Sequence, residues 1–211
     1  MSDTERKKLL MNIVCSDLEG VFVPEIWINV AQKTGIEELK LTTRDISDYD
    51  VLMQRRLKIL EENKLTIHDI TDVIATMDPL DGAVDFLDWL RSRSQVIIVS
   101  DTFEQFAGPL MKKLKMPTLF CHNLSINGSG MVTGYNLRQP EAKRQTVLAL
   151  KRLKYRVIAF GDSYNDIGML KEADAAMLFR PPQNVIQEFP QFPVTTDYAA
   201  LKTLLEKELA A

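Results

Sequence analysis

The chain has 211 residues, 45% of them hydrophobic and 26% charged, which is typical of one soluble core domain with room for a small insertion. The net charge of −3 and the lack of a basic block argue against nucleic acid or an anionic membrane surface as the main partner. No apolar stretch reaches the ~18 residues that span a bilayer, and the charged start MSDTERKKLL lacks a signal peptide's apolar core, so we expect a cytoplasmic protein.

Four short apolar runs predict buried β-strands. They are residues 12–16 (NIVCS), 96–100 (VIIVS), 157–160 (VIAF) and 175–179 (AAMLF). A half-exposed strand would alternate polar and apolar residues, whereas these runs are apolar throughout, as in a parallel sheet covered on both faces. Helical patterns lie between them, including one that runs through Phe103, Phe106 and Leu110. The fold predicted is a doubly wound, mostly parallel α/β sheet.

The segment from residue 25 to residue 78 breaks this alternation. It has no strand pattern but shows helical spacing around residues 26–33, 49–62 and 67–77. That is too much helix for one crossover, so we expect an inserted helical cap domain at residues 25–78, between core segments 11–24 and 79–211. Residues 1–10 are expected to be an N-terminal extension.

Two later segments also depart from the strand–helix pattern. Within residues 119–137, two β-like runs flank Asn127-Gly128, a strong signal for a hairpin turn. Residues 181–193 are interrupted by prolines and are expected to be irregular. Cys15 and Cys121 lie in separate apolar runs and are expected to be free, small buried residues, not a disulfide or a zinc site.

Three of the four apolar runs are followed at once, or after one glycine, by an aspartate: Asp17, Asp101 and Asp162. The carboxyl ends of neighbouring parallel strands meet at one edge, where ligands of open α/β sheets bind. Carboxylates gathered there repel one another unless a cation lies among them, and few hard oxygen ligands suit Mg²⁺. A single aspartate at a strand end more often caps a helix or starts a turn. Three together favour a shared site.

The spacing Asp17-Leu18-Glu19-Gly20 is suited to covalent catalysis. Extended residues two apart point the same way, so Asp17 as nucleophile and Glu19 as acid and base could face one substrate. Gly20 allows a sharp turn after the strand. Taken alone, this motif is weak, because such sequences are common in loops.

The segment Gly161-Asp162-Ser163-Tyr164-Asn165-Asp166 is more specific. We expect Asp162 to be a metal ligand, with Asp166 facing the same side of the next helix start. Ser163 and Asp166 also fit a helix-capping arrangement, and we accept that role for Ser163.

Two further residues could bind a phosphoryl group. Ser100 ends a strand just before a helix expected to begin near Thr102, and a hydroxyl beside helix N-terminal amides suits an anion. Lys143, near the start of another helix, could offset charge on a transferring phosphoryl group. Taken alone, such a lysine is usually a solvated surface residue, and the neighbouring Arg144 leaves the choice open.

These motifs, in this order, resemble those of the haloacid-dehalogenase-like superfamily, in its phosphatase branch. The resemblance covers the chain from about residue 11 onward, and the helical insertion matches the family's small cap. Within the family the chain is most similar to phosphoserine phosphatases, and to a subgroup that also transfers the phosphoryl group to homoserine. The supporting stretches are DLEGVFVPEIW, TTRDISDYDVLM, SDTF, RQPEAKRQ, GDSYND and NVIQEFPQFP.

The resemblance implies a role for each matching residue. Asp17 would be the nucleophile, and Asp17, Asp162 and the backbone carbonyl of Glu19 would bind Mg²⁺. The Glu19 carboxyl would be acid and base. The phosphoryl group would be held by Ser100, Lys143 and Asn165, with Asp101 close by. A homodimer is also implied.

Glu25 and Arg56 would bind the amino and carboxyl groups of the substrate. A guanidinium suits a carboxylate bidentately, and an acid suits a helix start. From the residues alone, Arg56 could equally form a surface salt bridge.

Two departures from ordinary phosphoserine phosphatases support the transferase-like subgroup. Glu19 stands where aspartate is usual, and Asp101 stands where a small residue is usual. Hydrolysis of phosphoserine, with transfer to homoserine, is the activity that the resemblance implies.

Four other functions share part of this set of residues. A phosphatase of another small phosphometabolite would share every motif. A protein that only binds a phosphometabolite could have the same residues without the arrangement that catalysis needs. A response-regulator receiver lacks a long helical insertion. A haloacid dehalogenase needs no metal, so Glu19 and Asp162 speak against it.

Overall fold

The computed structural model describes residues 10–42, 45–46 and 48–211. The expected N-terminal extension therefore lies, apart from residue 10, outside the described residues. In the described part of the chain, seven strands form one sheet in the order β4-β3-β2-β1-β5-β6-β7. Every pair is parallel except β3 with β4. The predicted α/β class is confirmed.

The strands are β1 (Met11–Ser16), β2 (Gln95–Phe103), β3 (Thr118–Ile126), β4 (Val132–Asn136), β5 (Tyr155–Gly161), β6 (Ala175–Phe179) and β7 (Val194–Thr195). The helices are α2 (Ile26–Thr34), α3 (Tyr49–Glu62), α4 (Ile67–Thr76), α5 (Ala83–Arg91), α6 (Glu104–Lys113), α7 (Ala142–Arg152), α8 (Ile167–Glu172), α9 (Gln183–Glu188) and α10 (Tyr198–Ala210). Two short 3₁₀ helices are η1 (Glu37–Lys40) and η2 (Tyr164–Asp166).

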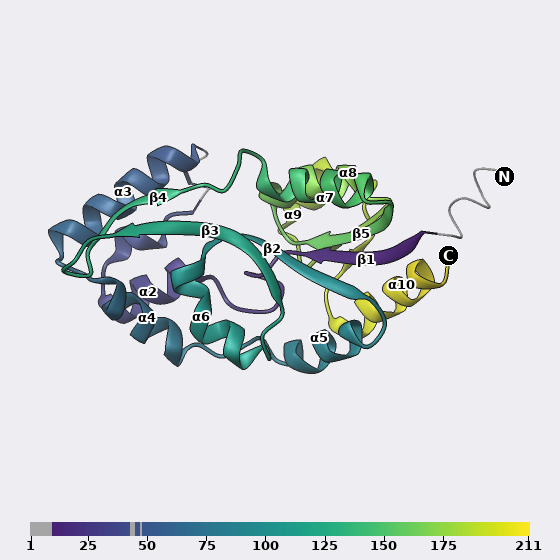
Figure 1. Ribbon diagram of the computed structural model, residues 1–211, viewed down its shortest axis with the longest axis horizontal. Coiled ribbons are helices and arrows are strands. Elements are labelled where there is room, and N and C mark those ends of the chain that lie inside the picture. Colours follow the sequence, from purple (N-terminus) through teal and green to yellow (C-terminus); the bar gives the residue numbers. More distant parts are fainter. Residues whose placement is uncertain (1–9, 43–44, 47) are drawn as a thin grey trace.

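Both faces of the sheet are covered, which explains why its strands are apolar throughout. Val14 and Phe160 face one cluster, in which Phe86 of α5 and Leu201 of α10 are also buried. Cys15 and its neighbours on the other strands face a second cluster, covered by α7, α8 and α9. Figure 1 shows these two helical layers on opposite sides of β1 and β5. Both cysteines are free thiols; Cys15 is buried as expected, whereas Cys121 is only half-buried.

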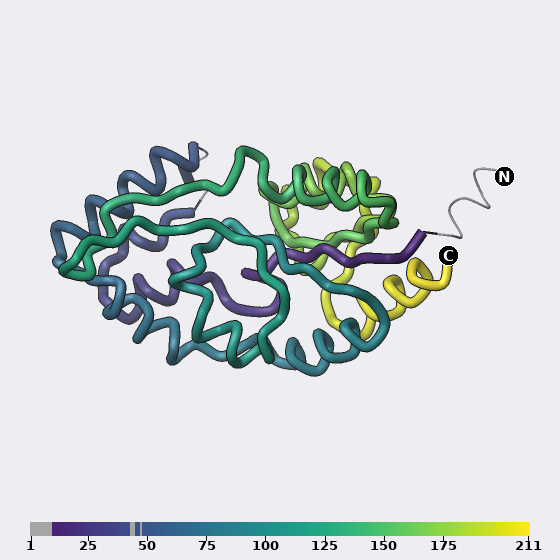
Figure 2. The backbone as a smooth tube through the Cα atoms, viewed as in Figure 1, coloured from purple at the N-terminus to yellow at the C-terminus, as the bar shows by residue number. Residues whose placement is uncertain are grey.

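The helices between β1 and α5 lie at one end of the molecule (Figure 2). The predicted helix at residues 49–62 is α3, and the predicted helices around residues 26–33 and 67–77 are α2 and α4. The predicted hairpin is β3 and β4, which extend from the sheet beside these helices (Figure 1). A bridge between Thr66 and Met131 joins the tip of the hairpin to the start of α4.

Two local predictions were wrong. β2 continues through Asp101 to Phe103, so α6 begins at Glu104 and not near Thr102. Residues 181–193 were expected to be irregular, but they contain α9, which starts directly after Pro182. Proline is well tolerated where a helix starts, because the backbone N–H it lacks has no partner there. Within the described ranges, no helix combines the length and apolarity needed to cross a membrane.

Candidate active site

The first strand places Asp17 next to Lys143. Asp17 directly follows β1 and is 4% exposed, and Lys143 is the second residue of α7 and equally buried. Lys143 Nζ lies 2.8 Å from Asp17 Oδ1 and 2.7 Å from Asp166 Oδ1. β1 is hydrogen-bonded to β2 on one side and to β5 on the other, so the pair lies where the strand order reverses.

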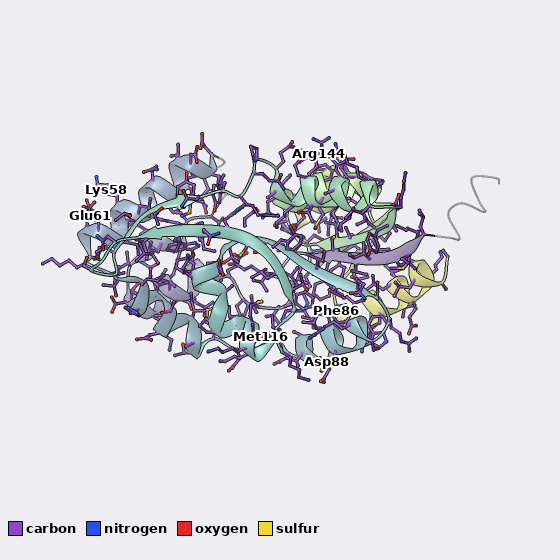
Figure 3. All side chains as sticks on the ribbon, viewed as in Figure 1. Lys58, Glu61, Phe86, Asp88, Met116 and Arg144 are labelled. Carbon is purple, nitrogen blue, oxygen red and sulfur yellow. The ribbon has the colours of Figure 1, made fainter. Side chains whose placement is uncertain are left out.

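The structure separates Lys143 from the neighbouring Arg144. Arg144 lies on the outer surface of α7 (Figure 3), where it pairs with Glu172 at 2.8 Å and Glu141 at 3.1 Å. Of these two adjacent cations, Lys143 is therefore the one beside Asp17. Burial lowers the pKa of Lys143, but the charges of Asp166, Asp17 and Asp101 outweigh it and raise the pKa well above its ordinary value. The side chain stays a cation.

Three buried carboxylates form a group that could hold a metal ion. One oxygen from each of Asp17, Asp162 and Asp166 lies within 4.8 Å of the others. Burial, and then the charge of Asp166, raise the pKa of Asp162 to about 7. The same two causes raise the pKa of Asp17 well above its usual range, although Lys143 opposes them. Carboxylates that repel one another this strongly, with oxygen donors only, fit a hard divalent cation.

Asp166 also organises its own loop. Its second oxygen, Oδ2, accepts the backbone N–H groups of Asp162 at 2.9 Å and Ser163 at 3.1 Å. This is the capping arrangement expected of Ser163 and Asp166, here at the start of η2. Asp166 thus joins the loop after β5 to Lys143.

Gly20 lets the loop after β1 approach Asp162 closely. Its φ is +73°, a left-handed conformation that other residues rarely adopt. A Cβ at this position would lie 2.5 Å from Asp162 Oδ2, which is too close for any side chain. Glycine is therefore required here for two reasons: the left-handed turn of the backbone, and the close approach of Asp162, a candidate metal ligand.

Glu19 lies in the loop between β1 and α2. Its carboxyl accepts the N–H of Ile26, the first residue of α2, at 2.8 Å. Burial and the charge of Glu25 raise the pKa of Glu19 to about 8. A carboxyl with this pKa holds its proton at neutral pH and is suited to donating it.

Ser100, Asp101 and Asn165 lie around the same lysine. Ser100 is 3% exposed, and its hydroxyl accepts the N–H of Thr102 at 3.2 Å. Because β2 runs on past it, Ser100 does not stand at a helix N-terminus, and that part of its expected anion site is absent. Asn165 Nδ2 donates to Asp101 Oδ2 at 2.9 Å, and Lys143 Nζ lies 3.7 Å from the same oxygen.

Asp101 has a third neighbour that was not predicted from the sequence. His122 of β3 is 3% exposed, and its Nε2 lies 3.5 Å from Asp101 Oδ1. Burial raises the pKa of Asp101, but Lys143, His122 and Asn165 together lower it to about 2. The predicted β-run at 119–126 could have placed His122 beside β2. It could not have shown which face the ring occupies.

Tyr49, at the start of α3, was also missed. Its hydroxyl donates to the backbone carbonyl of Asp101 at 3.3 Å, which connects the helical insertion to β2. The sequence offered no signal for this contact, because the two residues are distant in the chain.

Arg56 of α3 is buried, with 7% of its surface exposed. Its guanidinium lies 4.5 Å from the Trp27 ring centroid, and Nη2 donates to the carbonyl of Leu41 at 2.8 Å. Its buried Nε has no hydrogen-bond partner among the described residues. Burial lowers its pKa to about 10, while the charges of Glu19 and Glu25 act in the opposite direction. This is not the surface salt bridge that the sequence had left open.

Glu25 immediately precedes α2 and is half-buried. Its charge acts on Glu19, Asp162 and Arg56, so it lies within electrostatic reach of both the carboxylate group and the buried guanidinium. The expected substrate-binding pair thus stands on the insertion side of the site.

A family model for haloacid dehalogenase-like hydrolases matches residues 8–174. The chain belongs to this hydrolase family. The hydrolase is 62% identical over 192 residues to a curated protein named phosphoserine phosphatase ThrH from Pseudomonas aeruginosa, a match that covers 91% of this chain and 94% of the relative. It is 59% identical to a phosphoserine phosphatase of Pseudomonas syringae pv. tomato, covering 91% and 81%. The resemblance to the phosphoserine phosphatase group, and to ThrH within it, is confirmed.

Solved structures share the fold of the hydrolase at low sequence identity. A substrate-bound phosphoserine phosphatase complex superposes with a TM-score of 0.73 at 19% identity, covering 93% of this chain and 98% of the other. A phospho-aspartyl intermediate analogue of phosphoserine phosphatase superposes with a TM-score of 0.72 at 19% identity, covering 94% and 99%. At this identity the likeness establishes the fold alone.

Proposed function

We propose that this hydrolase is a magnesium-dependent phosphoserine phosphatase that works through an aspartyl phosphate on Asp17. The observation that carries the proposal is the buried ion pair between Asp17 and Lys143, at 2.8 Å, beside Asp162 at the switch point of the sheet. The names of the two Pseudomonas relatives, at 62% and 59% identity, support phosphoserine as the substrate.

In the first step, Asp17 attacks phosphorus and the serine oxygen leaves. Glu19, protonated because its pKa is raised to about 8, donates a proton to that oxygen. In the second step, ionised Glu19 takes a proton from water, which attacks the aspartyl phosphate and releases inorganic phosphate. Lys143, Ser100 and Asn165 bind the oxygens of the phosphoryl group and stabilise its charge.

Mg²⁺ would be held by Asp17, Asp162 and the backbone carbonyl of Glu19. When bound, the ion supplies positive charge that keeps Asp17 ionised and offsets the negative charge of the phosphoryl group. Asp166 is already engaged with Lys143 and two backbone N–H groups, so its role is to hold the loop and the lysine in place.

The amino-acid part of the substrate would bind on the side of the insertion. Arg56 would receive the carboxylate, for which its buried guanidinium has a free Nε, and Glu25 would receive the ammonium group. Residues 25–78 would then act as a cap over the core formed by residues 11–24 and 79–211, closing to exclude water during the reaction.

Homoserine would replace water as acceptor in a second activity. Its hydroxyl would attack the aspartyl phosphate, with Glu19 again as the base, and phosphohomoserine would be released. The extra methylene of Glu19, compared with the aspartate usual at this position, moves the carboxyl by about one bond, which would change how readily water or another hydroxyl acts as the acceptor.

The test is phosphate release from O-phosphoserine with Mg²⁺ or with EDTA, with and without homoserine, and with Asp17→Asn as the control. We expect Mg²⁺-dependent release that the variant lacks, and phosphohomoserine when homoserine is present. If the wild-type protein released no phosphate in any arm, phosphoserine would not be the substrate. If homoserine formed no phosphohomoserine, the transferase activity would be excluded.

A further inference from the structure

A chain of polar contacts leads away from the phosphoryl site to a buried histidine. His122 lies on β3, and its Nδ1 accepts the backbone N–H of Arg138, at 3.1 Å, from the loop between β4 and α7. A ring nitrogen that accepts a hydrogen bond carries no proton, so the proton of the neutral ring is on Nε2. That nitrogen faces Asp101 Oδ1 at 3.5 Å. The backbone therefore determines which atom His122 offers to Asp101.

The two oxygens of Asp101 face different partners. Oδ1 faces His122, whereas Oδ2 accepts from Asn165 at 2.9 Å and lies 3.7 Å from Lys143. Asn165 is held in this orientation because its own carbonyl oxygen accepts the hydroxyl of Ser163 at 2.6 Å. The network thus runs from β3 through β2 to the loop after β5.

The position of Asp101 matters because Lys143 is shared. Lys143 already contacts Asp17 and Asp166 at closer range, and Asp101 is the third carboxylate around it. An Asp101 carboxylate free to rotate would move toward the ammonium group and compete with the phosphoryl group for it. It would also release the Asn165 amide.

We propose that His122 is a positioning residue for phosphoryl transfer: its Nε2–H holds Asp101 so that the carboxylate orients Asn165 and leaves Lys143 available to the phosphoryl group. This inference rests on the proposed function for its reaction but concerns a residue that the proposed mechanism does not use. His122 makes no contact with the reacting atoms and acts through Asp101. The alternative is that His122 is a buried core residue whose hydrogen bonds only stabilise the fold.

Two amide variants separate these roles. In His122→Asn, the amide oxygen overlays Nδ1 and keeps the acceptor for Arg138, but nothing reaches Asp101. In His122→Gln, the longer side chain places an amide N–H near the position of Nε2 and restores the donor. Each variant is combined with Asp101→Ala, and thermal unfolding is measured for all of them.

We expect His122→Asn to lower kcat about tenfold with phosphoserine, because a hydrogen bond to a charged group is lost, while KM changes little. His122→Gln should recover most of the activity. In the Asp101→Ala background, His122→Asn should have no further effect, because the partner through which it acts is gone. An equal loss in both backgrounds, or wild-type kcat in His122→Asn, would overturn the proposal.

The wild-type protein and all of these variants are also assayed with p-nitrophenyl phosphate, which carries no amino-acid group. If the wild-type protein is inactive toward phosphoserine but active here, the substrate assignment fails and the coupling between His122 and Asp101 is still measured. The inference and the proposed function therefore fail separately.

A spectroscopic readout does not depend on activity. The chain has only two histidines, so imidazole proton–nitrogen correlations are assigned with His68→Gln. We expect His122 to show a bare Nδ1 and a protonated Nε2 whose signal moves in Asp101→Ala. A proton on Nδ1, or an Nε2 signal that Asp101→Ala leaves unchanged, would contradict the assigned contact even in an inactive protein.

Discussion

Lys143 has three carboxylates around it, at 2.8 Å for Asp17, 2.7 Å for Asp166 and 3.7 Å for Asp101. Burying several charges together is costly, and apolar residues of similar size often give a more stable protein. Such an arrangement is more readily explained by chemistry than by stability. The proposed mechanism uses three of these four groups, since Asp17 attacks, Lys143 binds the phosphoryl oxygens and Asp166 holds the lysine.

Gly20 and Gly35 give a matched pair at the residue scale. Both have φ of +73°, but a Cβ would meet Asp162 Oδ2 at 2.5 Å at Gly20 and nothing within 4 Å at Gly35. Alanine at either position should cost about 1 kcal/mol of stability from backbone strain. Only Gly20→Ala should also lower kcat/KM, by roughly a hundredfold, because Asp162 is displaced. Urea unfolding and steady-state kinetics check this, and equal activity in the two variants would contradict it.

Arg56 and Arg55 test the substrate assignment in the same way. Arg56 is buried with its guanidinium over the Trp27 ring, whereas the adjacent Arg55 is exposed. Arg56→Met should raise KM for phosphoserine about tenfold to a hundredfold, because a charged hydrogen-bond partner of the carboxylate is lost. KM for p-nitrophenyl phosphate should change little, and Arg55→Met should resemble the wild type. A similar loss with both substrates would mean that Arg56 supports the fold and not the amino-acid group.

The residue-scale contacts are the part of the site that the sequence predicted least well. Asp17, Asp162 and Lys143 could be recognised because each stands at the end of a strand or the start of a helix. The partners of Asp101 could not, because they depend on the pairing of β2 with β3 and on the face that the His122 ring occupies.

At the scale of elements, prediction succeeded where burial pattern alone decides the structure. The four apolar runs are strands because both faces of the sheet are covered. The start of α6 was predicted too early. The spacing of Phe103 and Phe106 fits one continuous helix, but it also fits a strand that ends at Phe103 and is followed by a helix. α9 was missed because prolines were taken as breaks, although Pro182 stands where a helix tolerates one.

The cap of α4 gives a prediction for its stability and pH dependence. The hydroxyl and the N–H of Thr66 donate to Asp69, at 2.6 and 2.7 Å, and lower the pKa of Asp69 below its ordinary value. Thr66→Ala should therefore lower the free energy of unfolding by about 1 kcal/mol.

The sign of the pH effect follows from the direction of that pKa shift. A carboxyl with a lowered folded-state pKa stabilises the fold above its unfolded pKa, about 3.9, and loses this as pH falls through the folded value. The difference in unfolding free energy between wild type and Asp69→Asn should thus be present at neutral pH and disappear as the pH falls below the unfolded pKa of about 3.9 and through the lowered folded pKa. Asp72→Asn, which removes the same charge from the exposed face of α4, is the control. Equal effects of the two variants in urea unfolding would contradict the cap.

For the whole molecule, the order of the strands explains how distant segments form one site. The sequence order reverses at β1, so the ends of β1, β2 and β5 meet although they lie far apart in the chain. In the proposed function, the helices between β1 and α5 contribute Arg56 and Glu25 from the other side. The general location of the site could be predicted from strand ends, whereas the contact of Tyr49 with Asp101 and that of the hairpin with Thr66 required the tertiary structure.

Metal binding should stabilise the whole fold. Without a cation the carboxylates of Asp17 and Asp162 repel, so Mg²⁺ at about 100 times its Kd should add ~2.7 kcal/mol to the free energy of unfolding. Asp162→Asn should abolish this gain, and NaCl at matched ionic strength should not reproduce it. Thermal unfolding with Mg²⁺ or EDTA measures both. An equal rise in Tm for wild type and Asp162→Asn would place the ion elsewhere.

The most direct test of the central claim is to trap the phosphorylated protein. Turnover of phosphoserine labelled on phosphorus is stopped with acid, and the peptides are mapped. The account predicts label on the peptide that contains Asp17, released by hydroxylamine as an acyl phosphate is, and absent from Asp17→Asn. Rapid turnover with no label on this peptide, together with retained activity in Asp17→Asn, would contradict it.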